Sequence, residues 1–237
     1  MRTTILTYST PDELSKAASN KFIEAAQRAI SERGRFLVSL SGGSTPMKLF
    51  ERLAKETLDW SLAHFFWCDE RCVPMDDPGN TYGQTKKILF DNIGTTNIHR
   101  VESELEPALA AQAYAHTLCG FAEAPLDFPR FDLVLLGMGD DGHTASLFPG
   151  SPVEIETPTI AVTAQYQDRP ANRVSLTPKV LNQARETWFL VTGAGKAETL
   201  RNVIKGERNL GLYPAQRIQP TNGNLVWMID KAASSLL

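Results

Sequence analysis

The sequence predicts an α/β fold with a mainly parallel sheet flanked by helices. Short apolar stretches with the length of buried strands alternate along the chain with amphipathic stretches of helical period. Glycines, prolines and capping hydroxyls follow several strand-like stretches, where a strand must turn into a helix. No internal repeat, low-complexity tract or linker interrupts the 237 residues, so we expect one domain over residues 1–237.

The first helix is predicted to start at Thr10 and to end before Gly34. Thr10 is suited to cap the helix, Pro11 to occupy its first position, and Glu13 to complete a capping box. Apolar residues then recur at helical spacing from Phe22 to Ile30. Glycine is the residue that most often follows a helix, which explains the predicted end.

The other elements follow from the same two patterns. Helices are predicted at 45–56, 80–93, 106–121 and 196–206, and the first of these is entered through a Thr45 cap and Pro46. Strands are predicted at RFLVSL (35–40), AHFFWCD (63–69), FDLVLLG (131–137), TPTIAVTAQ (157–165), NRVSLT (172–177), ETWFLVTG (186–193) and NLVWMID (224–230). Because ligands of such folds bind beyond the carboxyl ends of the strands, we expect the functional residues in the loops after them.

Composition argues against several classes of protein. With a net charge of -3 the chain has no general nucleic-acid surface, although a local basic pocket remains open. The apolar runs are too short to span a bilayer, and the N-terminus turns polar too early for a secretory signal. Three cysteines without a C-x-x-C pair favour a reduced, cytoplasmic enzyme. From the net charge and the short apolar runs we expect neither nucleic acid nor membrane as a partner.

The loop after the strand at 35–40 has the composition of a phosphate cradle. Gly42 and Gly43 let backbone N–H groups approach an anion, and a helix N-terminus adds partial positive charge. Ser41, Ser44 and Thr45 supply hydroxyl donors. The spacing is not that of a Walker A loop, and a tight strand-to-helix turn explains the same residues equally well.

Three consecutive charges, Asp69, Glu70 and Arg71, follow four apolar or aromatic residues. A solvated strand end is the usual explanation of such a group. Alternatively, Arg71 faces a bound anion while one of the carboxylates holds it in place, because an arginine fork matches phosphate or a developing oxyanion.

The stretch FDLVLLGMGDDGHTASLFPG (131–150) satisfies the dinucleotide pattern G-x-G-x-x-G through Gly137, Gly139 and Gly142. Two observations argue against a dinucleotide. Two aspartates would face the negative pyrophosphate, and the next predicted strand ends without the acidic residue that binds ribose.

The same loop is better explained by a catalytic histidine. His143 follows Asp141 by two residues at a strand end, an arrangement that fits a general base and the carboxylate that orients it. A helix cap or a core histidine is the alternative. No G-x-S-x-G nucleophile elbow, H-E-x-x-H motif or comparable ligand cluster occurs, so we expect no catalytic metal.

Two further cations lie near predicted turns. Lys196 follows Gly193 and Gly195 between a strand and a helix, where it is able to reach a phosphate. Arg173 begins the strand at 172–177. Each has a surface charge as its alternative explanation, and for Arg173 the sequence does not separate the two.

Taken together, the motifs resemble the 6-phosphogluconolactonase family. LSGGSTP, DER, GMGxDGHTASLFPG, RVSLT and TGAGK occur in the family's order between Leu40 and Lys196. Related glucosamine-6-phosphate deaminases share the GxGxDGH start but continue differently from Ser146-Leu147-Phe148-Pro149. The resemblance implies a Rossmann-like α/β fold of the sugar-phosphate isomerase type, no metal or other cofactor, and hydrolysis of 6-phospho-D-glucono-1,5-lactone in the oxidative pentose phosphate pathway.

For this reaction the sequence gives a set of expected roles. His143 is the base that activates water and Asp141 orients it, while Arg71 serves the phosphate or the oxyanion. Binding of the phosphorylated sugar is expected from the residues Ser41, Gly42, Gly43, Ser44, Thr45, Asp69, Arg173 and Lys196. Two rivals remain: an isomerase or deaminase that uses Asp69 as a carboxylate base, and a non-enzymatic sugar-phosphate sensor.

Overall fold

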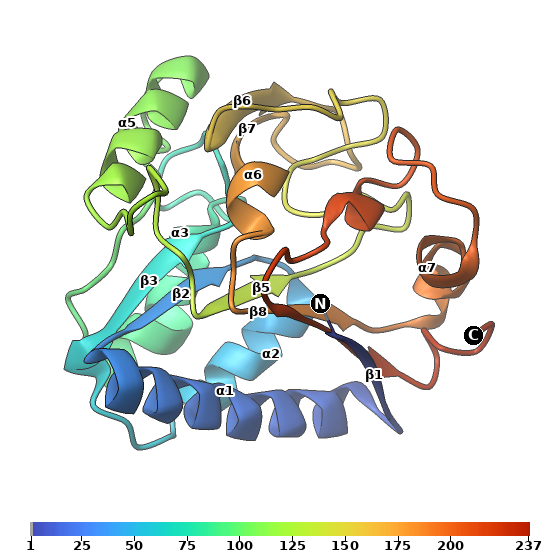
Figure 1. The fold of residues 1–237 in the computed structure, drawn as a ribbon, viewed down its shortest axis with the longest axis horizontal. Helices are drawn as coiled ribbons and strands as arrows, with labels where there is room; N and C mark the ends of the chain where they lie inside the picture. Colours follow the sequence, from blue (N-terminus) through green and yellow to red (C-terminus); the bar gives the residue numbers. More distant parts are fainter. Residues whose placement is uncertain (1) are drawn as a thin grey trace.

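The computed structural model describes residues 2–237, and its main element is a six-stranded parallel sheet (Figure 1). The strand order is β1-β9-β8-β5-β2-β3, and every neighbouring pair is parallel. The mainly parallel sheet predicted from the sequence is therefore confirmed. The strands are β1 (Arg2–Tyr8), β2 (Phe36–Leu40), β3 (Ala63–Trp67), β5 (Leu133–Leu136), β8 (Glu186–Val191) and β9 (Asn224–Asp230).

Two features of the strands were not predicted. The edge strand β1 is rich in threonine and largely exposed, so it lacks the apolar run that marked the other strands. In addition, β4 (Asp69–Arg71), β7 (Asn172–Leu176) and β6 (Thr159–Thr163) form a separate antiparallel sheet. Strand length and apolar content do not reveal which sheet a strand joins.

The chain passes from the first sheet to the second at Cys68. Its N–H donates to the carbonyl of Leu40 over 2.7 Å, and its own carbonyl accepts the N–H of Leu176, also over 2.7 Å. The buried hydroxyl of Tyr114 fixes the same point, because it accepts the N–H of Trp67 and donates to the Trp67 carbonyl. The predicted strand 63–69 is thus divided, and its last charges belong to the second sheet.

The first helix, α1 (Pro11–Arg33), has the predicted ends. Thr10 accepts the N–H of Glu13, and Gly34 closes the helix with φ 73°. The capping box differs in one partner, because the Glu13 carboxylate accepts the N–H of Ser9 over 3.0 Å. The helix packs its buried alanines, leucine and phenylalanine on the sheet, as expected for a helix with one apolar face.

The predicted threonine cap of the next helix is wrong. The helix α2 (Ser44–Leu53) follows Gly43, which has φ 107° and offers no side chain, so Thr45 lies inside the first turn. Its hydroxyl contacts that of Thr192 at 2.8 Å. The first N–H groups of a helix have no intrahelical partners, and a glycine cap leaves them without a side-chain acceptor.

The remaining helices agree with the prediction in position but are shorter. The segment predicted as one helix at 80–93 combines α3 (Thr81–Thr85), the π-helical turn η2 (Lys86–Phe90) and α4 (Asp91–Ile93). The other elements are α5 (Pro107–Cys119), α6 (Pro178–Leu181), α7 (Ala197–Lys205), and the short 3-10 turns η1 (Trp60–Leu62), η3 (Ala194–Lys196) and η4 (Pro214–Arg217). Among residues 2–237, no helix has the length and apolar character needed to cross a membrane.

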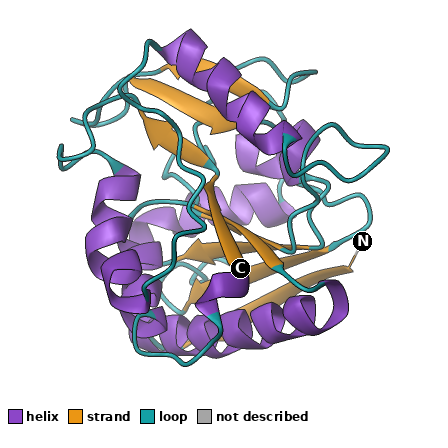
Figure 2. Cartoon of the chain, turned by 90° about the vertical axis from the view of Figure 1, so that its left-hand side faces the viewer, coloured by secondary structure: helices purple, strands orange, loops and turns teal. Residues whose placement is uncertain are grey.

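Helices lie on the parallel sheet (Figure 2), and two clusters of buried hydrophobic side chains pack against it. One cluster joins α1 and α2 to the sheet and includes Phe22 and Phe50. The other lies between the sheet and α5, α6, α7 and the second sheet, and it includes Phe131 and Trp227. Each such side chain contributes about 1.5–3 kcal/mol when fully buried. The sheet therefore holds its strand-end loops on a packed scaffold.

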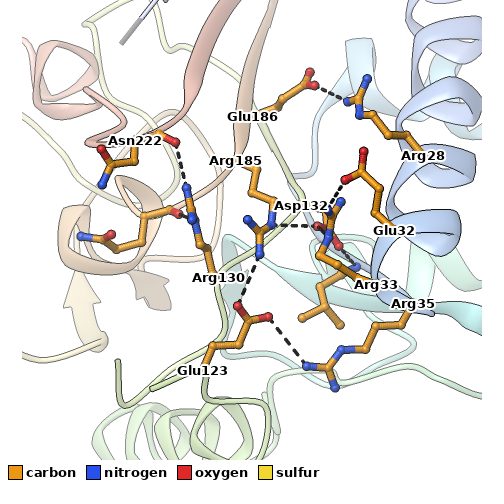
Figure 3. A network of polar contacts seen from close by, with 12 residues as sticks. Arg28, Glu32, Arg33, Arg35, Glu123, Arg130, Asp132, Arg185, Glu186 and Asn222 are labelled. Atoms are coloured by element: carbon orange, nitrogen blue, oxygen red, sulfur yellow. Dashed lines mark hydrogen bonds and ion pairs between the residues drawn. The ribbon is translucent and has the colours of Figure 1, made fainter. Parts of the chain in front are cut away.

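A network of ion pairs closes the amino ends of β2, β5 and β8 (Figure 3). Asp132, which is buried, accepts the N–H of Leu37 over 2.8 Å and the Nε of Arg33 over 2.9 Å. Arg185 Nε lies 3.2 Å from the same carboxylate, and Arg28 pairs with Glu186 on the next strand. The network joins α1 to three strands at the end opposite to their carboxyl termini.

Candidate active site

A polar cleft of about 280 Å³ lies at the carboxyl ends of the central strands. The loops after β2, β5 and β8 form one side of it, and the second sheet contributes β4, β7 and the connection between β6 and β7. The predicted site residues that line it are Ser41, Gly42, Gly43, Ser44, Thr45, Asp69, Arg71, His143, Arg173 and Lys196. The fold therefore brings together segments more than 150 residues apart in the sequence.

The histidine and the aspartate of the β5 loop are in direct contact. His143 Nδ1 lies 2.7 Å from Asp141 Oδ1, and the same oxygen accepts the His143 backbone N–H over 3.0 Å. Burial opposes ionisation of Asp141, but the hydrogen bonds and charge of His143 outweigh it and lower the pKa of the carboxyl. An ionised Asp141 holds the Nδ1 proton, and Nε2 is then the basic nitrogen of the imidazole.

Gly139 is the residue that permits this contact. A Cβ at this position would lie 2.1 Å from His143 Nδ1 and 2.4 Å from Asp141 Oδ1. The loop then turns through Gly142, whose φ is 85°. The glycines that resemble a dinucleotide pattern thus give the histidine and the aspartate room to approach the backbone.

Two buried arginines lie side by side on the second sheet. Arg71 of β4 is directly opposite Arg173 of β7 in the antiparallel register, and they are 9% and 1% exposed. Arg71 donates through Nη1 to the carbonyl of Gly79 and to the hydroxyl of Thr81. Arg71 Nε and the Nε and Nη2 atoms of Arg173 are buried without a hydrogen-bond partner among the described residues.

This arrangement places two positive charges and several unpartnered donors beside the cleft. Burial lowers the pKa of Arg173, and the neighbouring Arg71 adds to the effect while Asp69 opposes it. Buried donors without partners cost free energy, and a bound anion would satisfy them. Of the alternatives in the sequence, a solvated strand end at 69–71 and a surface charge at Arg173 are both wrong.

The two carboxylates beside Arg71 have different surroundings. Asp69 lines the cleft and accepts the hydroxyl of Ser146 over 2.7 Å. Glu70 points away from it and accepts the N–H groups of Arg71, Thr81 and Tyr82 over 2.7–2.8 Å. Since Thr81 also contacts Arg71, Glu70 fixes the segment that holds the guanidinium in place.

The loop after β2 contributes backbone and hydroxyl groups. The Ser41 hydroxyl is buried and has no partner among residues 2–237. Gly42 approaches Thr81 so closely that a Cβ would lie 2.8 Å from its methyl group. The loop and Arg71 therefore meet at the same threonine.

Lys196 lies at the end of η3 and is half-buried. Burial lowers the pKa of its ammonium, although the charges of Asp140 and Asp141 oppose this effect.

The residues that line the cleft from the β6–β7 connection were not predicted. These are Tyr166, Gln167 and Arg169. Strand ends of the parallel sheet were the guide to function, and this connection belongs to the second sheet. Its aromatic and charged residues, in QYQDRP (165–170), were the available signal. Among the residues that the structure describes, no group of three or more His, Cys, Asp or Glu side chains is arranged to hold a metal ion.

Comparisons with known proteins agree with the motifs. Residues 9–227 match the family model described as glucosamine-6-phosphate isomerases/6-phosphogluconolactonase. The chain is 41% identical to the 6-phosphogluconolactonase of Haemophilus influenzae over 84% of its own length and 87% of that protein. For the Synechocystis 6-phosphogluconolactonase the values are 39%, 89% and 88%. The solved structure of Trypanosoma brucei 6-phosphogluconolactonase superposes with a TM-score of 0.86 at 29% identity, covering 100% of this chain and 99% of that one.

Proposed function

The chain belongs to the glucosamine-6-phosphate isomerase/6-phosphogluconolactonase family, and from this membership we propose that it is a lactone hydrolase. The reaction is the conversion of 6-phospho-D-glucono-1,5-lactone to 6-phospho-D-gluconate, the second step of the oxidative pentose phosphate pathway. The observation that carries the proposal is that His143, which is paired with Asp141, faces the same cleft as two buried arginines with unpartnered donors. We also propose that residues 1–237 act as one domain, because both hydrophobic clusters pack on one sheet.

His143 supplies the base. Its Nε2 takes a proton from a water molecule as the water oxygen attacks the lactone carbonyl carbon, while Asp141 holds Nδ1 and stabilises the imidazolium. The tetrahedral intermediate then breaks the bond between the carbonyl carbon and the ring oxygen. The imidazolium returns the proton to that oxygen, which becomes the free hydroxyl of the product, and the histidine is neutral again.

The phosphate is held at the other side of the cleft. Arg71 and the β2 loop meet at Thr81, so the guanidinium and the amides of Gly42 and Gly43 converge on one anion. Arg173 adds a second set of free donors beside Arg71. The remaining groups proposed to surround the phosphate are the hydroxyls of Ser41, Ser44 and Thr45 and the ammonium of Lys196, all of which line the cleft. We therefore propose that Arg71 binds the phosphate and does not stabilise the oxyanion.

Asp69 is the residue on which the rival function depends. An isomerase or deaminase needs a carboxylate to move a carbon-bound proton, and Asp69 lines the cleft. In this chain its carboxylate is engaged by Ser146 and lies in the field of Arg173. We propose that it orients Arg173 and contacts sugar hydroxyls, which leaves His143 as the base.

A hydrolysis assay tests the proposal. Purified protein should accelerate the disappearance of the phosphorylated lactone beyond the spontaneous rate, which is measured in parallel and subtracted. The same protein should release no ammonia from glucosamine 6-phosphate. Ammonia release without lactone hydrolysis would favour the rival, and tight binding of 6-phosphogluconate without turnover would favour a sensor.

A further inference from the structure

Tyr166 in the β6–β7 connection lies against the proposed base. The centroid of its ring is 4.5 Å from that of His143, and the two planes meet at 75°. Phe148 contacts the same imidazole, with centroids 4.5 Å apart and planes inclined by 30°. The two aromatic rings are 5.8 Å from each other, so the three rings form one cluster at the cleft.

Asp140 holds Tyr166 in this place. The tyrosine hydroxyl donates a hydrogen bond to the Asp140 carboxylate, 26 residues away in sequence. The backbone carbonyl of Asp140 in turn accepts the hydroxyl of Thr199 on α7. Asp140 is therefore tied both to a helix and to the connection that covers the cleft.

The hydrogen bond between Tyr166 and Asp140 keeps its donor and its acceptor over a wide pH range. The hydrogen bond from Tyr166 lowers the pKa of Asp140, so the carboxylate stays ionised. Burial, and then the same carboxylate, raise the pKa of Tyr166 to about 12, so the hydroxyl keeps its proton. A neutral donor facing an ionised acceptor is the stronger kind of hydrogen bond.

The imidazole has few other contacts that fix its orientation. Asp141 restrains one end of the ring through Nδ1, but a single hydrogen bond leaves the ring free to tilt about it. Phe148 limits the tilt on one side. Contact with Tyr166, whose ring plane is inclined by 75° to that of the imidazole, supplies a further restraint.

We propose that Tyr166 is a positioning residue for His143 and that Asp140 acts through Tyr166 by fixing its ring. The expected loss of kcat rests on the proposed function. The expected change in the orientation of the His143 ring rests on the geometry alone. Without the tyrosine hydroxyl, the connection loses its bond to the β5 loop, and the imidazole is held in its reactive orientation for a smaller fraction of the time.

A spectroscopic experiment tests the geometry without any substrate. The imidazole Cε1–H resonance of His143 is identified among four histidines by its loss in His143→Ala. Tyr166→Phe keeps the ring but removes the hydroxyl, and Asp140→Ala removes the acceptor. Both should shift or broaden this resonance. The matched control is Thr163→Val, which removes another hydroxyl bond in the same hairpin, that to Asn172, and should leave it unchanged.

Kinetics then test the consequence. Tyr166→Phe should lower kcat on the phosphorylated lactone on the order of 10-fold, while KM changes little, because only the orientation of the base is lost. Asp140→Ala should lower kcat to a similar extent, and the double variant should lose no more kcat than the worse single variant, since both changes release the Tyr166 ring. KM is compared in Tyr166→Phe alone, because the charge of Asp140 also acts on Lys196.

Two outcomes would separate the inference from the proposed function. A His143 resonance identical to wild type in both Tyr166→Phe and Asp140→Ala would overturn the inference, whatever the enzyme hydrolyses. So would wild-type kcat in both variants. A protein inactive on the lactone but with the shifted resonance would refute the proposed function alone and would support the positioning of His143 by Tyr166.

Discussion

Replacing Gly139 by alanine is expected to disable the proposed catalytic pair, His143 and Asp141, although neither of these two residues is itself substituted. The new Cβ would lie 2.1 Å from His143 Nδ1 and 2.4 Å from Asp141 Oδ1, where ordinary contacts begin at 3.4 Å. At least one side chain must therefore move by roughly 1 Å, and a misplacement of that size can cost about 10²-fold in rate. We expect kcat to fall by about this factor.

The binding site should remain intact in this variant. Arg71, Arg173 and the β2 loop lie on other segments, so affinity for 6-phosphogluconate should stay close to wild type. Crowding of a packed loop costs about 1–3 kcal/mol of stability, which thermal unfolding would register. Kinetics with the phosphorylated lactone, isothermal titration with the product and circular dichroism measure the three effects.

A second glycine provides the control. A Cβ at Gly211 would meet its nearest neighbour, Asn209 Oδ1, at 3.6 Å, an ordinary contact, so Gly211→Ala should hydrolyse the lactone at the wild-type rate. If a folded Gly139→Ala variant hydrolyses the lactone as fast as wild type, contact between His143 and Asp141 is not needed for the reaction. The proposed mechanism would then lose its central feature.

Three further results are expected. His143→Ala should lower kcat by about 10²–10⁴-fold, with product affinity little changed. Wild-type turnover in this variant would direct attention to Asp69. Arg71→Ala should raise KM for the phosphorylated lactone more than it lowers kcat. For the wild-type enzyme, unphosphorylated gluconolactone should be a far poorer substrate than the phosphorylated lactone. Equal rates on both lactones would contradict the proposed role of Arg71 in phosphate binding. Exhaustive chelation with EDTA should leave hydrolysis intact, and a loss restored by zinc or magnesium would reveal a metal requirement.

Local signals in the sequence predicted the elements with strong caps and apolar runs. Thr10, Pro11 and Gly34 define α1 because each acts on its own neighbours, through a side-chain cap, a fixed φ and a left-handed turn. Thr45 is also followed by a proline but lies inside the first turn of α2, because Gly43 takes the cap position. Thr45 also lacks the capping-box glutamate that Glu13 supplies three residues after Thr10.

Long-range pairing was the part that local patterns could not reveal. The edge strand β1 is stabilised by β9, more than 200 residues away, and its own residues are mostly polar. The sequence leaves Arg173 open between an anion contact and a surface charge, and in the structure it is buried on β7, which pairs with β4. His143 and Asp141, by contrast, are two residues apart, so their contact was predictable from one loop.

The second sheet explains why the cleft carries so much unpaired positive charge. Parallel strands present backbone amides and loop side chains at one edge, which suits a base and a glycine-rich turn. The second sheet adds two guanidinium groups that lie next to each other, because its antiparallel register sets Arg71 of β4 directly opposite Arg173 of β7. Cys68 ties β4 to the end of β2 through Leu40, so the arginines come to lie below the loop that begins at Ser41. The proposed division of work follows from this placement: a loop of the parallel sheet carries the proposed base, and the antiparallel sheet carries two of the cations proposed to bind the phosphate.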